Sequence, residues 1–354
     1  MKFGGDVVTE IKSSIGVRQG LCEGPILFLL VMQAVLETIK WPDEIVKPSF
    51  MTALSNGKLK ERVNRRQDVE PYEFWSSLYA DDFVVFFKER AHLDLGAKYL
   101  VSHFKKFGLL MHTGKVGTTS KTVAMFCPSQ SVNYADEDTS DIVLDADGNI
   151  IPFTRSTIYL GTEISDSLDS TADVERRIKK ASNMVGALRE LFTRRDIGYK
   201  DKGTIYKCLC LSILLYGSEC WCMTETLMGK LRSFHALSAR IMCGVNMYHV
   251  QQHHITTASL LSRLDLKSIE HYFQSRFLRW SGHVARMPLS RLPRKFLTSW
   301  IADAIRPAGH PFTSWVTTLV DTLEAKNIST VFSEWTELAQ DRAGWFDLLN
   351  ADSS

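Results

Sequence analysis

The chain has 354 residues, 45% hydrophobic and 23% charged, which excludes a disordered or low-complexity chain and allows two or three domains with sizeable cores. Its net charge of +2 gives no general preference for acidic partners. The longest apolar run, Ile26–Met32, is far too short to span a bilayer, the N-terminus has no signal-like pattern, and seven cysteines are typical of reduced thiols. We therefore expect a cytoplasmic or nuclear protein without a membrane partner.

The first feature in chain order is Gly16-Val17-Arg18-Gln19-Gly20, which leads through Pro25 into the apolar run. Proline suits the first turn of a helix, so the pattern predicts a loop that opens onto a helix. Gly20 and Gly24 allow a ligand to approach the backbone closely. The preceding residues, 2–15, favour a strand, and the basic segment 47–70, which has no clear periodicity, favours an exposed insertion.

The second feature is Tyr79-Ala80-Asp81-Asp82, which lies between two apolar runs of strand-like composition, Phe74–Tyr79 and Phe83–Phe87. This pattern predicts a β-hairpin with acidic residues at its tip. Neighbouring carboxylates repel each other unless a cation neutralises them, and Mg²⁺ prefers hard oxygen ligands, so a metal site is one interpretation. The other interpretation is a simple turn, because aspartate bonds its own backbone in turns.

The two features together resemble motifs B and C of the reverse transcriptases of non-LTR (LINE-type) retrotransposons. Further segments look like later parts of that family. Phe107-Gly108-Leu109 with Ser120–Met125 is similar to motif D, and Tyr159-Leu160-Gly161 to motif E. The segments similar to the region beyond the polymerase domain are Leu215–Trp221, Trp280–Pro288 and Trp335–Trp345. The resemblance covers nearly the whole chain.

The resemblance implies RNA-directed DNA polymerisation, a nucleotidyl transfer with two Mg²⁺ ions, deoxynucleoside triphosphates, an RNA template and a DNA primer. Asp81 and Asp82 would be the catalytic, metal-holding residues. The residues implied to contact nucleotide, template or primer are Arg18, Gln19, Gly20, Tyr79 and Lys121, the last by neutralising phosphate charge.

The chain also departs from the family. There, fingers and motif A precede motif B, and motif A supplies another metal-binding aspartate, whereas only fifteen residues precede Gly16 here. Cys22-Glu23-Gly24 stands where the family has Pro-Leu-Ser. We therefore expect a truncated chain that is inactive alone and depends on an upstream retrotransposon segment. The alternatives are a non-catalytic nucleic-acid-binding remnant and the translated tail of a decayed element.

Downstream, residues 131–170 contain nine acidic residues against Arg155 alone, and an Asp147-Gly148-Asn149 turn predicts a second hairpin at the outer edge of the palm. From Ser170 the periodicity becomes helical. The apolar stripe comprises Val174, Ile178, Ala181, Val185, Leu188 and Phe192. The basic residues expected largely off it are Arg176, Arg177, Lys179, Lys180, Arg189, Arg194 and Arg195. They indicate either a nucleic-acid surface or a solvated face.

Residues 261–300 combine eight basic residues with aromatic ones, a composition that suits single-stranded nucleic acid, although Phe273 and Phe277 recur at helical spacing and fit a core better. The pairs Cys208/Cys210 and Cys220/Cys222 invite a zinc interpretation together with nearby histidines. Each pair has one intervening residue where zinc sites have two to four, so buried reduced thiols are favoured.

These observations predict an α+β chain. The expected regions are an incomplete right-hand polymerase palm of antiparallel strands and helices at 1–167, a helical thumb-like region at 168–250 and a helical C-terminal region at 251–354.

Overall fold

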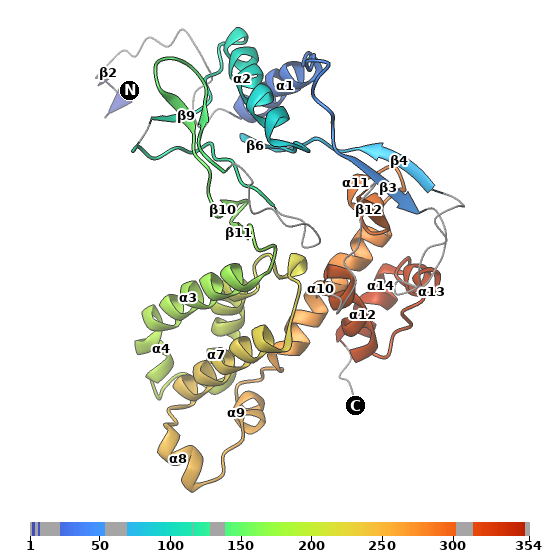
Figure 1. Cartoon of the computed structure of the whole chain (residues 1–354). Helices are drawn as coiled ribbons and strands as arrows, with labels where there is room; N and C mark the ends of the chain where they lie inside the picture. The colour runs from blue at the N-terminus through green and yellow to red at the C-terminus, as the bar shows by residue number, and fades with distance from the viewer. Residues whose placement is uncertain are drawn as a thin grey trace. The chain divides into compact units, whose positions relative to one another are not determined.

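The structure is a computed structural model that describes residues 2–3, 6–7, 22–53, 69–115, 117–127, 139–301 and 314–350. Helices and small antiparallel sheets make up this part of the chain, as in an α+β protein (Figure 1). The described residues fall into two compact units. The first unit takes those within 1–48, 73–124 and 138–153, and the second unit those within 49–72, 125–137 and 154–354.

In its described residues the first unit contains two helices and strands that form short sheets. Its elements in the described residues are β1 (Lys2–Phe3), β2 (Asp6–Val7), α1 (Gly24–Glu37), β5 (Ser76–Tyr79), β6 (Asp82–Val85), α2 (Arg90–Lys106), β7 (Gly114–Lys115), β8 (Ile142–Val143) and β9 (Asn149–Ile151), of which α1 and α2 are the helices longer than one turn.

The second unit is mainly helical, with η1 a π-helix and η2 a 3₁₀-helix. Its elements in the described residues are β3 (Ser49–Ala53), β4 (Val69–Glu73), β10 (Ser156–Tyr159), β11 (Thr162–Ser165), α3 (Thr171–Ala187), α4 (Arg189–Thr193), α5 (Tyr199–Ile205), η1 (Tyr206–Leu211), α6 (Ser212–Leu214), η2 (Ser218–Cys220), α7 (Glu225–Cys243), α8 (Met247–Gln252), α9 (Thr257–Arg263), α10 (Ile269–Ala285), α11 (Leu292–Phe296), β12 (Ser299–Ile301), α12 (Trp315–Ala325), α13 (Phe332–Leu338) and α14 (Arg342–Asn350).

Helix α1 begins at the predicted place, with Pro25 in its first turn, so the expected loop-to-helix junction is confirmed on its helical side. The helix buries Met32 and Val35 against Leu100 and Phe104 of α2. Five further apolar side chains of the helix are exposed; they are Ile26, Leu27, Leu29, Leu30 and Val31.

Helix α2 ends in a motif that requires a glycine. Gly108 has φ +73°, its N–H donates to the carbonyl of Lys105 (3.0 Å), and the N–H of Leu109 donates to the carbonyl of Phe104 (3.1 Å). This is a Schellman motif, in which a left-handed residue satisfies the last carbonyls of a helix. The glycine in Phe107-Gly108-Leu109 is therefore explained by the end of helix α2.

The acidic segment forms the predicted hairpin. Strands β8 and β9 pair in antiparallel fashion with Ile142 opposite Ile151, and Gly148 lies in the turn with φ +77°. Asp145 accepts hydrogen bonds from the backbone of Asp147 and Asn149 and from the Asn149 side chain. These bonds lower the pKa of Asp145.

Two expectations for the N-terminal third were wrong. A strand was expected to start at Lys2 and continue, whereas β1 and β2 are two short strands that pair with each other, Lys2 opposite Val7. Segment 47–70 was expected to be an exposed insertion; its residues 54–68 lie outside the described residues, but in the described part β3 forms the centre of a sheet with the order β12-β3-β4. Thr52 of β3 is buried, because β12 covers it from 247 residues further along the chain (299 − 52).

One hydrophobic core holds the second unit together. It runs from Val174 of α3 to Leu349 of α14, and its largest fully buried side chains include Trp221, Trp335 and Trp345. Residues on both sides of position 250 share this core, while the division of the chain into three regions stays a prediction. Within the described residues, no helix is both long and apolar enough to cross a bilayer.

Candidate functional site

The β5–β6 hairpin carries the acidic pair. Leu78 is opposite Phe83 and Tyr79 is opposite Asp82, so Ala80 and Asp81 form a two-residue turn, with Ala80 at φ +53°. The predicted hairpin is therefore confirmed. Because cross-strand partners point to the same face of a sheet, Tyr79 and Asp82 lie side by side on one face.

Apolar packing anchors the base of the hairpin and leaves its tip in solvent. Leu78, Phe83 and Val85 pack against the cluster that α1 and α2 form, with the rings of Phe83 and Phe104 6.0 Å apart. At the tip, Asp81 and Asp82 are exposed, and Tyr79 has 65% of its surface accessible. The hairpin thus presents two hard oxygen donors on a fixed base.

The donor set at this tip fits Mg²⁺ in one particular manner. Magnesium in phosphoryl-transfer sites is bound through one or two carboxylates together with substrate phosphates. Asp81 and Asp82 provide two carboxylates. Across the ranges that the structure describes, no three His, Cys, Asp or Glu side chains come together as a metal site. The tip therefore fits one half of a shared metal site and not a closed protein cage.

The other expected site residues are not brought to this tip by any described contact. Arg18, Gln19 and Gly20 lie outside the described residues. Lys121 is exposed, and its backbone N–H donates to Nδ1 of His112 (3.3 Å). Glu23, which precedes α1, is exposed and its carbonyl accepts from the N–H of Leu27 (3.0 Å).

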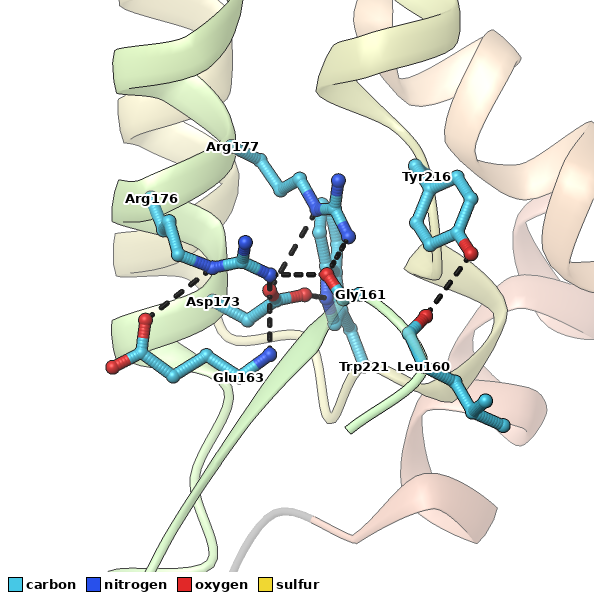
Figure 2. Close-up of polar contacts among 8 residues, drawn as sticks. All are labelled: Leu160, Gly161, Glu163, Asp173, Arg176, Arg177, Tyr216 and Trp221. Atoms are coloured by element: carbon cyan, nitrogen blue, oxygen red, sulfur yellow. Dashed lines mark hydrogen bonds and ion pairs between the residues drawn. The ribbon is translucent and has the colours of Figure 1, made fainter. Parts of the chain in front are cut away.

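A second constellation, in the second unit, was not predicted. Asp173 on α3, which Figure 2 shows with its partners, is buried, with only 1% of its surface exposed. Its Oδ2 accepts from Nε1 of Trp221 (2.9 Å), and its Oδ1 accepts from the backbone N–H of Glu163 (3.0 Å) and from Nη2 of Arg176 (2.8 Å). Arg177 completes an ion pair with the same oxygen at 3.6 Å. One carboxylate therefore joins β11, α3 and the segment after η2.

The same constellation holds the turn of the β10–β11 hairpin. Arg176 and Arg177 both donate to the carbonyl of Gly161, and the hydroxyl of Tyr216 donates to the carbonyl of Leu160 (3.0 Å) (Figure 2). The guanidinium of Arg177 also lies over the ring of Tyr216, 4.3 Å from its centre. Two segments that the sequence singled out separately, Tyr159–Gly161 and Leu215–Trp221, are thus in direct contact.

The prediction for the position of Arg177 on α3 was wrong. Arg177 was expected largely off the apolar stripe of α3, but it is 5% exposed. The reason is its position, three residues after Val174 and four before Ala181, which places it on the buried side. Burial lowers the pKa of Arg177, while Asp173 acts in the opposite direction. The signal in the sequence is the spacing: Arg177 follows Asp173 by four residues and lies between the apolar positions Val174 and Ala181.

Arg176, expected with them, is half-buried and pairs with Asp173 and Glu163, whereas the other basic residues of that prediction do face solvent. Lys179, Lys180, Arg189 and Arg195 are exposed, and Arg194 is exposed but paired with Asp196. The apolar stripe itself is confirmed, since Val174, Ala181, Val185 and Phe192 are buried. The segment therefore has a basic outer face and a rigid attachment to the rest of the second unit.

The proposed core aromatics of segment 261–300 are also confirmed. Phe273 and Phe277 are 2% and 0% exposed on the inner face of α10. Phe296 instead packs against Phe50 and Tyr72, although part of its surface is exposed. Trp280 keeps 38% of its surface exposed.

The cysteine pairs divide between core and surface. Cys210 of η1 is buried in the main core, and burial raises its pKa to about 11. Cys208 and Cys220 are exposed, and Cys222 is partly buried. Burial also raises the pKa of Cys222 and Cys243. A high thiol pKa disfavours the thiolate, the form that binds metal.

Comparisons with known proteins give one informative match. No family model matches the chain. A Caenorhabditis elegans protein, F52C9.6, described as transposon-derived and uncharacterized, is 22% identical over 278 residues, which are 78% of this chain and 95% of that protein. This similarity links the chain to transposable elements.

One buried histidine gives the second unit a pH-dependent stability. Nε2 of His235 on α7 lies 3.0 Å from the carbonyl of Lys267, and Nδ1 lies 3.0 Å from the hydroxyl of Tyr206. A carbonyl only accepts, so Nε2 donates, and in the neutral ring Nδ1 then accepts from the Tyr206 hydroxyl. Burial lowers the pKa of His235, although the Lys267 carbonyl and Glu270 oppose the shift.

We expect the second unit to lose stability as the pH falls below about 6.5, the ordinary histidine pKa. In that range the unfolded chain takes up a proton that the native ring resists, so the contribution of His235 is present above this pH and lost below it. Urea midpoints at pH 7.5 and pH 5.5, followed by tryptophan fluorescence, measure the effect. In His235→Gln the difference between the two midpoints should shrink; an unchanged difference would assign the pH dependence to the carboxylates.

Proposed function

We propose that this chain carries part of the RNA-directed DNA polymerase of a non-LTR retrotransposon, with the first unit forming a portion of its palm. The observation that supports this most is the exposed pair Asp81 and Asp82 on the fixed β5–β6 hairpin. The similarity to a transposon-derived protein supports the same origin.

Asp81 and Asp82 are the residues that would hold Mg²⁺. When bound, the two metal ions of such a site supply charge stabilisation for the attacking and leaving oxygens of nucleotidyl transfer. The hairpin itself keeps both carboxylates in solvent, where a nucleotide can reach them. Tyr79, on the same face as Asp82, supports the primer end in this proposal.

The nucleotide and the template are assigned to the surrounding residues. Arg18, Gln19 and Gly20 contact the nucleotide or template in this proposal, and Lys121 neutralises phosphate charge. The described residues bring no third ligand to the tip, so an opposing carboxylate from an upstream retrotransposon segment completes the site. The isolated polypeptide is therefore inactive in our proposal.

The metal-holding role is tested by replacing Mg²⁺ with Fe²⁺. With hydrogen peroxide as oxidant and ascorbate to return Fe³⁺ to Fe²⁺, iron bound at the hairpin generates hydroxyl radicals that cut the nearby backbone. The purified chain, mixed with primed RNA and a nucleotide, should therefore be cut around residues 79–82. The double variant Asp81→Asn/Asp82→Asn should lose this cut. Asp147→Asn, in the turn of the equally acidic β8–β9 hairpin, is the matched control and should be cut as the wild type.

Two results would contradict the proposal in different parts. A wild-type chain without a cut at the hairpin would overturn the metal-holding role. Nucleotide incorporation by the purified 354-residue chain, abolished by Asp81→Asn, would overturn the proposed inactivity and would make the polymerase site self-sufficient.

A second candidate function is non-catalytic nucleic-acid binding. The exposed basic side chains of α3 and α4, Lys179, Lys180 and Arg189, favour it, because such groups release counterions from a phosphate backbone on binding. Binding that survives Asp81→Asn and weakens steeply with salt, in a chain without hairpin cleavage, would favour this candidate over the first.

A further inference from the structure

The outer face of α10 combines an exposed aromatic side chain with unneutralised positive charge. Trp280 has 38% of its surface exposed, and the ring of His283, one turn further along the helix, lies 5.5 Å from it at an interplanar angle of 45°. Tryptophan is usually well buried, and the core of this unit takes Trp221, Trp335 and Trp345 completely. Trp280 therefore keeps a solvent-exposed part that these three tryptophans lack.

Helical geometry places the arginines beside this ring. The core side of α10 is made by Phe273, Phe277, Ser281 and Val284, all buried. The cationic positions off this side, at spacings of three and four residues, are Arg276, Arg279, His283 and Arg286, and Trp280, seven residues after Phe273, lies at the border between the two sides. Trp280 thus lies at the edge of a stripe of cationic side chains.

The stripe has little opposing charge. From residue 271 to residue 291 the chain has four arginines, two histidines and no acidic residue. Glu219 from the packed η2 pairs with Arg276 (3.2 Å) and takes up one charge. Within the described ranges, no ion pair neutralises Arg279. Arg286 donates to the carbonyl of Ala339 (2.6 Å).

Helix α14 adds further charge next to Arg286. Burial and the neighbouring Arg342, which is exposed, both lower the pKa of Arg286. Asp341 is the acidic residue beside them, and its Oδ1 accepts from the backbone N–H of Ala343 (3.1 Å). Arg279, Arg286 and Arg342 therefore present a positive edge that an anion can approach.

We propose that this surface, the α10 face (Arg279, Trp280, His283 and Arg286), binds an unpaired stretch of nucleic acid, with a base stacked on Trp280 and phosphates contacted by the arginines. Every base has a π-face, so stacking tolerates any sequence. A duplex needs only the charges, because its bases are already stacked, whereas an exposed indole next to cations favours a single strand. The inference rests on the proposed function in that it names a surface for the polymerase's nucleic-acid partner.

The test measures affinity with the full 354-residue chain. Fluorescence anisotropy with a labelled 12-nucleotide single strand and with a blunt duplex of equal length gives the two dissociation constants. Trp280→Ala should weaken single-strand binding by about tenfold and leave duplex binding nearly unchanged. Trp280→Phe should retain most of the affinity, since a smaller ring still stacks.

Charge and controls are tested in the same assay. Arg279→Gln should weaken binding to both ligands and reduce the slope of log K against log salt by about one. The matched control is Tyr248→Ala on α8, an exposed aromatic with 67% of its surface accessible and the ring of His249 beside it, which should bind as the wild type. Unchanged far-UV circular dichroism and an unchanged thermal midpoint of Trp280→Ala confirm that the fold is intact.

The results separate this inference from the proposed function. If Trp280→Ala binds single strands as the wild type does, or if the wild type prefers the duplex, the inference is overturned even if the hairpin is cut by iron. If the iron cut is absent while Trp280→Ala loses single-strand binding, the metal-holding role of the hairpin is overturned and single-strand binding by the α10 face is supported.

Discussion

Asp173→Ala is expected to destabilise the second unit by about 3–5 kcal/mol, the range for removing one partner of a buried ion pair. The substitution leaves Arg177 buried without its counter-charge and removes the acceptor of Trp221 Nε1. It also releases the N–H of Glu163, so the β10–β11 hairpin loses one of its attachments to α3. Urea unfolding followed by tryptophan fluorescence measures the change.

The control for this prediction lies on the same helix. Glu175 is exposed and pairs with Lys230 at the surface, so Glu175→Ala should change the free energy of unfolding by no more than about 1 kcal/mol. Asp173→Asn keeps hydrogen-bond acceptors without the charge and should fall between the two. Equal destabilisation by Asp173→Ala and Glu175→Ala would show that the buried constellation contributes no more than a surface pair.

Gly203→Ala is expected to destabilise the second unit by about 1–3 kcal/mol or more, as overpacking does. Gly203 lies within α5, and a Cβ at this position would be 1.9 Å from the carbonyl oxygen of Leu264. Because the obstacle is backbone, no side-chain rotation relieves it, and the segment around Leu264 must move. Thermal unfolding by circular dichroism measures the effect.

A second helical glycine provides a control of opposite sign. Gly229 lies within α7, and a Cβ there would meet no atom within 4 Å. Gly229→Ala should therefore stabilise the protein by about 0.5–1 kcal/mol through helix propensity alone. If both substitutions changed the melting temperature in the same direction, the contact at Gly203 would not determine its effect.

The elements that the sequence predicted are those whose signals are local. The β5–β6 hairpin follows from two short apolar runs around a turn, and the turn at Gly148 from its glycine. Helix α3 follows from apolar residues at spacings of three and four. In each case the contacts that define the element join residues close together in the chain, so the local order of apolar, polar and turn residues predicts it.

The contacts that escaped prediction join distant segments. The Asp173 constellation draws on residues 161, 163, 176, 177, 216 and 221, and nothing in the composition of any one segment shows that they meet. The prediction for Arg177 was wrong because its charge was taken as a sign of exposure. In the structure its guanidinium is buried, pairs with Asp173 and donates to the carbonyl of Gly161.

In the candidate site, too, the local part could be predicted from the sequence and the part contributed by distant segments could not. Its acidic tip is a local feature and could be located from four residues, Tyr79–Asp82. An opposing metal ligand belongs to a different strand in the proposed site, and the pairing of distant strands is decided by tertiary packing that a single sequence does not reveal. The stacking residue of the α10 face became evident once Phe273 and Phe277 were placed in the core and Trp280 outside it.

The sheet of β12, β3 and β4 has a consequence for the synthesis of the chain. Thr52 pairs with Ser299, so β3 must wait for 247 further residues (299 − 52) before β12 exists. At about 5–20 residues per second, translation takes about 12–50 s to supply that partner. Throughout this interval one edge of β3 offers unpaired N–H and C=O groups to any neighbouring nascent chain. Crowded polysomes are therefore where we expect this protein to need a chaperone.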